Sequence, residues 1–240
     1  MSKPKTSYKL WIAGRLVRLL FVLLIIAVWA LLMWRIFISS KPPKEMDRLS
    51  PNAALSAAYS ANGGQLSPYT QEQSTVTRGE NNYGYFGVTR AVFVPEAGQV
   101  QVTFRYNNST LKAVQEDYQL DAKPPRGEEI FDVSLLLMTD LTPEDRSDNV
   151  DGSETIAQTR IAPTDKRIDT TLLYTYILYT FDGVDVADDT VAVFFDIYYQ
   201  SDVNYDAEPY GALRLYHSES PNLPVKITKK EQEAIAAYTP

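Results

Sequence analysis

Gln99-Val-Gln-Val-Thr-Phe-Arg-Tyr106 is the stretch that decides the fold, because its polar and apolar residues alternate without a break. In an extended chain, successive side chains point to opposite faces, so the four apolar residues from Val100 to Tyr106 share one face. The polar residues between them share the other. This period of two is typical of a half-buried β-strand and predicts a sheet with one apolar face.

Similar β-rich runs lie on both sides of this strand. Residues 86–94 precede it, and Pro95-Glu-Ala-Gly98 is expected to join the two as a hairpin. Strands do not alternate with helices, which argues against a parallel α/β sheet. We therefore predict an all-β fold, an antiparallel β-sandwich of the Ig-like type with about seven or eight strands. The later predicted strands are 130–139, 155–161, 171–181, 190–199 and 211–217, with a short one at 225–228.

Two short helices are expected within this domain. Residues 110–120 lack strand alternation and are interpreted as an inserted helix. Thr228-Lys-Lys-Glu231 matches a capping box, in which the Thr and Glu side chains each accept a backbone N–H of the first helical turn. It predicts a short C-terminal helix that follows the last strand.

The N-terminal region has a different character. Residues 19–34 carry no charge, and extension past Arg35 to residue 38 gives a run of 20 residues, enough to cross about 30 Å of hydrocarbon as a helix. A cleaved signal peptide has an apolar core of about 7–15 residues and small residues at its cleavage site. Here the core is longer, and bulky Ile38 stands at a position that needs a small residue. We therefore predict a transmembrane signal-anchor helix at 19–38, after a short basic tail at 1–18.

The distribution of charge predicts an orientation. Residues 1–18 contain five Lys and Arg and no acidic residue, whereas all 30 Asp and Glu lie after residue 40 with 17 basic residues. That later portion has a net charge of −13, which argues against binding to nucleic acid. We expect a single-pass protein of the cell membrane, with a cytoplasmic N-terminus and an extracytoplasmic C-terminal domain.

Residues 39–82 are rich in Ser, Pro, Asn and Gly and are predicted to be a linker. Ser50-Pro51 resembles an N-cap followed by a first-turn proline, and Asn62-Gly-Gly64 is typical of the end of a helix. A short helix is therefore predicted at 51–61. The rest is interpreted as a flexible spacer that holds the β domain, residues 83–240, away from the bilayer.

The sequence offers no catalytic set. Cysteine is absent, which removes thiol chemistry and fits a bacterial envelope protein better than a disulfide-bonded ectodomain. The single histidine, His217, ends a predicted strand, and no G-x-S-x-G turn presents a nucleophile. We expect no enzymatic activity and no cofactor.

One polar loop is a candidate calcium site. Asp148, Asn149, Asp151 and Glu154 lie close together in sequence, and their oxygen atoms are ligands that Ca²⁺ prefers. Ser147 stands where the calcium-loop pattern requires Asp, so the loop fails as an EF-hand. A looser calcium loop at a sandwich edge and a solvated connection are the two alternatives.

Tyr205 and Tyr210 are a candidate ligand platform, because both fall in the connection between two predicted strands. Exposed tyrosine rings beside carboxylates could stack on a sugar. The alternative is ordinary packing, since Tyr is also a favoured residue of strands and cores.

Three functions from different classes fit these features. The first is a non-catalytic module that binds a protein, or serves as a scaffold or subunit, at the cell envelope, anchored in the lipid bilayer through residues 19–38. The second is a ligand-binding module for cell-wall carbohydrate or calcium. The third, a carbohydrate-active enzyme, needs two carboxylates roughly 5–10 Å apart in a cleft, and no motif supports that placement. We expect the first.

Overall fold

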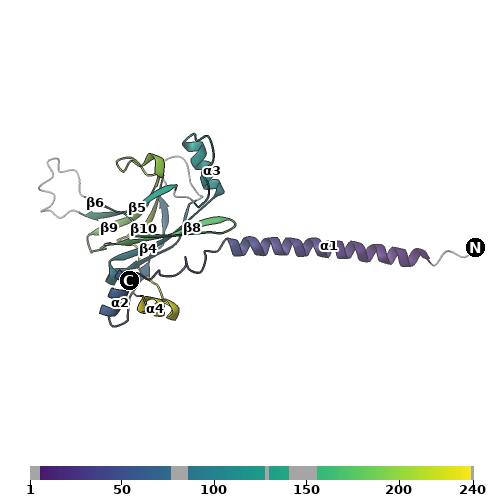
Figure 1. Ribbon diagram of the computed structural model, residues 1–240, viewed down its shortest axis with the longest axis horizontal. Coiled ribbons are helices and arrows are strands. Elements are labelled where there is room, and N and C mark those ends of the chain that lie inside the picture. The colour runs from purple at the N-terminus through teal and green to yellow at the C-terminus, as the bar shows by residue number, and fades with distance from the viewer. Residues whose placement is uncertain (1–5, 77–85, 128–129, 141–155, 239–240) are drawn as a thin grey trace, which may run out of the picture. The chain divides into compact units, whose positions relative to one another are not determined.

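The computed structural model describes residues 6–76, 86–127, 130–140 and 156–238 (Figure 1). The chain forms two compact units, Met1–Lys41 and Pro42–Pro240. The first contains one long helix, and the second contains two β-sheets with three short α-helices.

The long helix, α1 (Thr6–Ser39), confirms the apolar helix expected from the sequence and begins earlier than predicted. Its segment Ala13–Ser39 is long and apolar enough to cross a membrane, at 27 residues or about 40 Å. The large apolar side chains from Leu16 to Ile38 are at least 45% exposed, and none of this segment is buried inside the protein. A lipid environment would cover such a surface without the free-energy cost that water imposes.

Cation–π contacts mark both ends of α1. The Arg15 guanidinium lies 3.8 Å from the centre of the Trp11 ring, and the Lys41 ammonium lies 4.3 Å from that of Phe37. The two rings are 26 residues apart in sequence, or about 39 Å along a helix. This spacing matches a bilayer with its headgroup regions, where aromatic and basic side chains are favoured.

The second unit contains a six-stranded and a five-stranded antiparallel sheet. The first sheet has the order β11 (Leu223–Pro224), β1 (Tyr69–Thr70), β3 (Gly87–Val94), β4 (Gln99–Asn107), β8 (Tyr174–Asp182) and β7 (Asp165–Thr170). The second has the order β2 (Ser74–Val76), β10 (Gly211–His217), β9 (Thr190–Tyr199), β5 (Phe131–Asp140) and β6 (Ile156–Ile161).

The two sheets share one hydrophobic core. Phe104 of β4 and Phe181 of β8 both contact Phe195 of β9 in the other sheet, with ring centres 5.7 and 6.2 Å apart. The predicted apolar face of β4 is confirmed, since its four residues from Val100 to Tyr106 are at most 1% exposed. The mostly β, antiparallel architecture expected from the sequence is therefore present.

Most strands lie where the alternation and turn residues predict them. The hairpin of β3 and β4 closes through Pro95–Ala97, and Gly98 follows with φ 54°, a left-handed conformation that glycine adopts easily. The sequence missed β7, whose six residues are all exposed and show no alternation of burial. The last short strand, β11, lies two residues before the predicted one.

The described residues contain three short α-helices in this unit. The predicted inserted helix is α3 (Asn108–Asp117), and the predicted C-terminal helix is α4 (Lys229–Ala236), with the expected capping box of Thr228 and Glu231. The predicted helix at 51–61 is α2 (Ala53–Ala61). Its cap is Asn52, whose side chain accepts from the Leu55 N–H at 2.9 Å, and not Ser50 as predicted.

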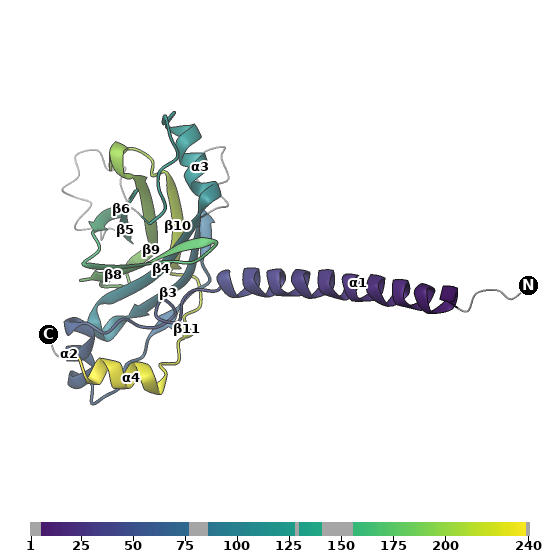
Figure 2. The same cartoon turned by 45° about the vertical axis from the view of Figure 1, so that its right-hand side comes forward.

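Residues that precede the strands in sequence cover the outer face of the six-stranded sheet. Leu49 and Leu55 pack with Val92 and Val94 of β3 and with Ile235 of α4 in a second apolar cluster. Figures 1 and 2 show α2 and α4 side by side against this sheet. The flexible spacer predicted on either side of this helix is not what residues 42–50 and 62–76 form, since both belong to the folded unit.

Candidate functional site

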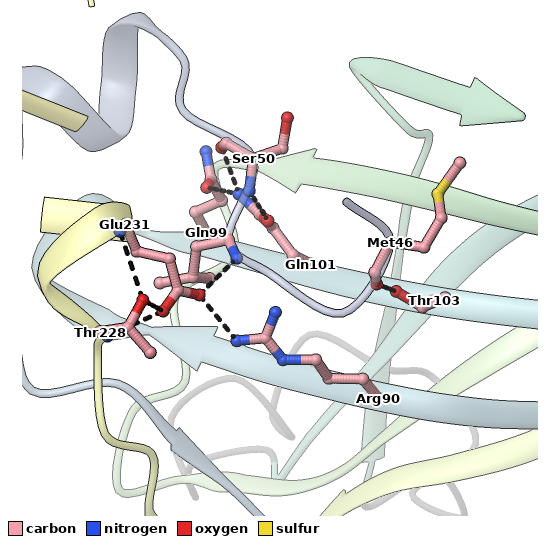
Figure 3. A network of polar contacts seen from close by, with 9 residues as sticks. Met46, Ser50, Arg90, Gln99, Gln101, Thr103, Thr228 and Glu231 are labelled. Atoms are coloured by element: carbon pink, nitrogen blue, oxygen red, sulfur yellow. Dashed lines mark hydrogen bonds and ion pairs between the residues drawn. The ribbon is translucent and has the colours of Figure 1, made fainter. Parts of the chain in front are cut away.

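The outward side chains of β4 form a polar surface that the chain covers with its own backbone. Gln101 is 3% exposed and binds both backbone groups of Ser50 (Figure 3). Its carbonyl oxygen accepts from the Ser50 N–H at 2.8 Å, and its amide donates to the Ser50 carbonyl at 2.9 Å. The Gln101 amide also donates to Gln99, whose own amide donates to Asp182 at 2.6 Å. The amide side chain thus pairs with an extended segment much as a neighbouring strand would.

Met46 is fixed on the same sheet by one polar and several apolar contacts. The Thr103 hydroxyl donates to the Met46 carbonyl at 2.6 Å. The Met46 side chain is 1% exposed and packs with Tyr176 and Leu178 of β8. Backbone groups of Met46 and Ser50 are therefore bonded to β4, and the Met46 side chain packs on β8.

Glu231 of α4 completes this arrangement. One carboxylate oxygen accepts from the Leu49 N–H at 2.9 Å and lies 3.5 Å from the Arg90 guanidinium. The other accepts from the backbone N–H and the hydroxyl of Thr228 at 2.8 and 2.6 Å. Burial opposes the charged form, but the hydrogen bonds from Thr228 and Leu49 and the charge of Arg90 outweigh it and lower the pKa of Glu231.

We name these contacts of Met46, Leu49 and Ser50 with β4 and Glu231 the membrane-proximal clamp. Only residues 40–45 separate it from the end of α1. An extended chain of this length spans at most about 25 Å, and Pro42-Pro43 restricts its backbone further. Six residues, 40–45, therefore lie between the last residue of α1 and the first bonded residue of the clamp, Met46.

The two tyrosines predicted as a platform have different environments. Tyr205 is 48% exposed, and its hydroxyl donates to Asp132, a bond that raises the pKa of Tyr205. Tyr210 is 8% exposed and belongs to the shared core. Its hydroxyl donates to Asp117 at 2.9 Å. The structure therefore does not bring the pair together as one exposed surface.

Arg160 of β6 lies beside Tyr205 in a cluster that the sequence analysis missed. Its guanidinium donates to Ser134 and Asp196 at 2.6 and 3.2 Å and to the Tyr198 hydroxyl at 3.2 Å. The guanidinium carbon also lies 4.8 Å from the centre of the Tyr205 ring. Asp196 is the residue that could have revealed this cluster in the sequence. A charged residue in an otherwise apolar central strand needs an opposite charge beside it.

The predicted calcium ligands Asp148, Asn149, Asp151 and Glu154 lie outside the described residues. Within the described ranges, no group of three or more His, Asp or Glu residues could hold a metal ion. His217 lies at the end of β10, where its Nδ1 accepts from the Glu219 N–H at 3.3 Å.

A cavity of about 500 Å³ lies between the segment after α3 and the end of β9. Its wall is mixed, with Pro124, Pro125 and Tyr199 beside Lys123 and Gln200. The Lys123 ammonium is already bonded to the Asn108 side chain at 3.3 Å. No acid–base pair is formed by the residues that line it.

Comparison of the chain with models of protein families, with curated proteins and with solved structures gave no match. A function for this chain must therefore be argued from the geometry of its described residues.

Proposed function

We propose that this protein is a single-pass, membrane-anchored extracytoplasmic module that acts through contact with another protein at the cell envelope, as a scaffold or subunit, and not by catalysis. The membrane-proximal clamp is the observation that carries this proposal. The lipid bilayer is its first partner, through the predicted span 19–38 within α1.

The clamp supports this function because it shortens the connection between helix and β unit. A flexible linker of 44 residues, as predicted from 39–82, would let the domain move through a large volume. Its effective concentration near any membrane partner would therefore be low. A connection of six residues limits the distance between the end of α1 and the clamp to at most about 25 Å. Such confinement favours a partner in or near the same membrane over a distant ligand.

The strand order supports the finer fold assignment, an Ig-like sandwich. The central strands β3-β4-β8-β7 and β10-β9-β5-β6 follow the order A-B-E-D and G-F-C-C′ of immunoglobulin-type domains. Strands β1, β11 and β2 extend the edges of this core. Because fold does not determine function, this order supports the architecture and leaves the function to the surface.

The surface around Tyr205 has the composition of a protein contact. Tyr205 is exposed beside the partly exposed Arg160, with buried Tyr198 beneath them, and Tyr and Arg are enriched where interfaces bind most strongly. Strand addition at the edge strand β7 is disfavoured, since four of its six residues are charged. The proposed contact therefore uses the side chains around Tyr205 and not the edge of β7.

The orientation can be tested directly because the chain has no cysteine. Single replacements Ser2→Cys and Asp188→Cys would be labelled in intact cells with a membrane-impermeant maleimide. We expect labelling of Asp188→Cys only, and labelling of Ser2→Cys after the cells are opened. The reverse pattern would place the β unit in the cytoplasm and refute the proposal.

The protein contact is tested by a photo-crosslinking amino acid at Tyr205, compared with the same residue at Asp188. We expect one discrete cross-linked product from Tyr205 and none from Asp188. A 12-residue Gly/Ser insertion after Lys44 should leave the melting temperature unchanged and reduce that product severalfold, because it releases the domain from the membrane layer. If the Tyr205 probe gives as much product with the insertion as without it, the role given to the clamp is contradicted.

The alternative, a binding module for cell-wall carbohydrate or calcium, has less support. Tyr205 alone of the predicted platform is exposed, whereas a stacking surface for sugar needs at least two coplanar rings. Calcium binding is tested by melting the protein in millimolar calcium and in chelator. A rise of several degrees in calcium would favour the alternative, because a ligand bound only by the native state stabilises it.

A further inference from the structure

The apolar helix is connected to the β unit close to one end of strand β8. The Met46 side chain packs on Tyr176, the third residue of that strand. The Met46 N–H also donates to the Pro43 carbonyl at 2.9 Å, and a turn of this kind brings the two Cα atoms within about 7 Å. Pro43 follows Ser39, the last residue of α1, by four residues, or at most about 14 Å of chain. Met46 therefore lies within about 21 Å of the end of α1.

The connection between β7 and β8, residues 171–173, projects beyond this point of attachment, and we name it the β7–β8 turn. The Thr171 N–H donates to the Tyr174 carbonyl at 2.8 Å. The Arg126 guanidinium donates to the carbonyls of Thr171 and Leu172, both at 3.1 Å. Leu172 is 55% exposed, more than any other large apolar side chain among the described residues of the β unit. It precedes Tyr176 by four residues, so it can reach about 14 Å past the clamp.

The side chains around the β7–β8 turn are of the same kinds as those at the ends of α1. The Arg105 guanidinium carbon lies 4.7 Å from the centre of the Tyr174 ring, as the Lys41 ammonium lies close to the Phe37 ring. Arg126 places a second cation beside the exposed leucine. Aromatic and basic side chains are both favoured at the headgroup level of a bilayer.

We propose that the β7–β8 turn is a second lipid contact of this protein, with Leu172 in the headgroup region of the bilayer that α1 crosses. This inference rests on the proposed function, because it requires α1 to be a membrane anchor. One leucine binds a bilayer weakly on its own, but the anchor keeps the turn at a high effective concentration beside the lipid. The contact fixes the orientation of the β unit. The exposed loop with Asp188 then points away from the lipid, since it follows the other end of β8, a strand of nine residues or about 30 Å.

The test uses the full chain, which has no cysteine, in phosphatidylcholine vesicles. Leu172→Cys, Asp188→Cys and Leu24→Cys each carry an environment-sensitive fluorophore, and quenching is measured with aqueous iodide and with nitroxide-labelled lipids. We expect the lipid nitroxides to quench the label at 172 severalfold more than the label at 188, and iodide to do the reverse. The label at 24, within the predicted span, reports whether α1 lies in the bilayer.

The possible outcomes separate this inference from the anchor itself. Equal quenching at 172 and 188, with the label at 24 in lipid, would overturn the inference and leave the anchor intact. Protection of the label at 172 from iodide without quenching by the lipid nitroxides would also overturn it, because that result indicates contact with another copy of the chain. A label at 24 that iodide quenches would refute both the anchor and the lipid contact.

A substitution tests the leucine itself, with the fluorophore on Thr170→Cys at the end of β7. Leu172→Asp should reduce quenching by the lipid nitroxides severalfold, because a carboxylate opposes entry into lipid. Leu223→Asp is the matched control: Leu223 is 50% exposed and lies on β11, at the opposite edge of the same sheet, so quenching should not change. Both variants should melt close to the parent, since both side chains are exposed. Unchanged quenching in Leu172→Asp, or an equal loss in Leu223→Asp, would refute the role of Leu172.

Discussion

At Glu231, a single carboxylate joins three parts of the chain that are far apart in sequence. It accepts from Leu49 shortly after the apolar helix, faces Arg90 of β3 and caps α4 through Thr228. Because its pKa is lowered on folding, the ionised form stabilises the native state. That contribution is complete above the ordinary Glu pKa of about 4.5 and is lost as the pH falls through the lower folded value.

Glu231→Gln should therefore lower the free energy of unfolding by about 1–3 kcal/mol at pH 7. The difference from the parent should shrink as the pH falls below about 4.5, and it should vanish once the carboxylate of the folded parent is protonated. Urea denaturation at both pH values measures this. Glu233→Gln on the same helix is the control, since Glu233 is exposed and should change stability by less than about 0.5 kcal/mol. A constant difference at all pH values would contradict the ionised role of Glu231.

Arg160 is the second residue with a large expected effect. Arg160→Ala removes the cation that faces Asp196, which is only 3% exposed, and should destabilise the protein by about 3 kcal/mol. Arg167→Ala on the exposed strand β7 is the matched control and should cost less than about 0.5 kcal/mol. Chemical denaturation measures the free energy of unfolding of both variants. An equal decrease in the two would mean that the Arg160 cluster contributes no more to stability than an exposed side chain does.

At the scale of elements, the sequence predicted the positions of the strands better than it predicted which segments cover them. The alternation in β4 gave the buried face from Val100 to Tyr106 correctly, because hydrophobic periodicity reports a local preference. It also implied that Gln99, Gln101 and Thr103 face water, yet all three are buried. Gln101 and Thr103 bond to backbone groups about 50 residues earlier in the chain, and a backbone group leaves no pattern in the sequence. Gln99 bonds to the side chains of Gln101 and Asp182.

The same reasoning explains the error over residues 42–76 and the outcome for the candidate sites. This segment attaches through backbone groups and through a few apolar side chains such as Leu49 and Leu55, while its overall composition is polar and resembles that of a linker. Tyr205 and Tyr210 had equivalent sequence contexts, and only the contact of Tyr210 with the shared core separates them. Pairing of Arg160 with Asp196 depends on sheet order, which periodicity does not encode.

Gln101→Leu tests the clamp as an element. It leaves both backbone groups of Ser50 buried without their side-chain partner, at a cost of about 2 kcal/mol. We expect amide hydrogen exchange to accelerate strongly at residues 46–50 while β8 and β9 stay protected. Gln158→Leu on β6 is the control for the same chemical change at an exposed site and should leave exchange at 46–50 unchanged. Unaltered exchange in Gln101→Leu would show that this bond does not hold the segment.

At the scale of the whole molecule, the boundary of the β unit is testable by truncation. The unit begins at Pro42 in the structure, whereas composition alone placed the domain at 83–240. Residues 42–240 should melt in one cooperative transition. Residues 83–240 lack β1, β2 and the clamp and expose Val92 and Val94, so they should melt at least about 10 °C lower or aggregate. Thermal melts followed by circular dichroism decide this, and equal melting temperatures would restore the linker interpretation.

The bond from Leu49 to Glu231 also has a consequence for synthesis. Leu49 leaves the ribosome 182 residues before the carboxylate that binds it. Closing so long a loop is slow, and it cannot begin until α4 has emerged. The bonds of Ser50 and Met46 to β4 close loops of 51 and 57 residues and can form earlier. The segment nearest in sequence to the apolar helix is thus the first part of the β unit to be made, and its last bond forms only when the chain is nearly complete.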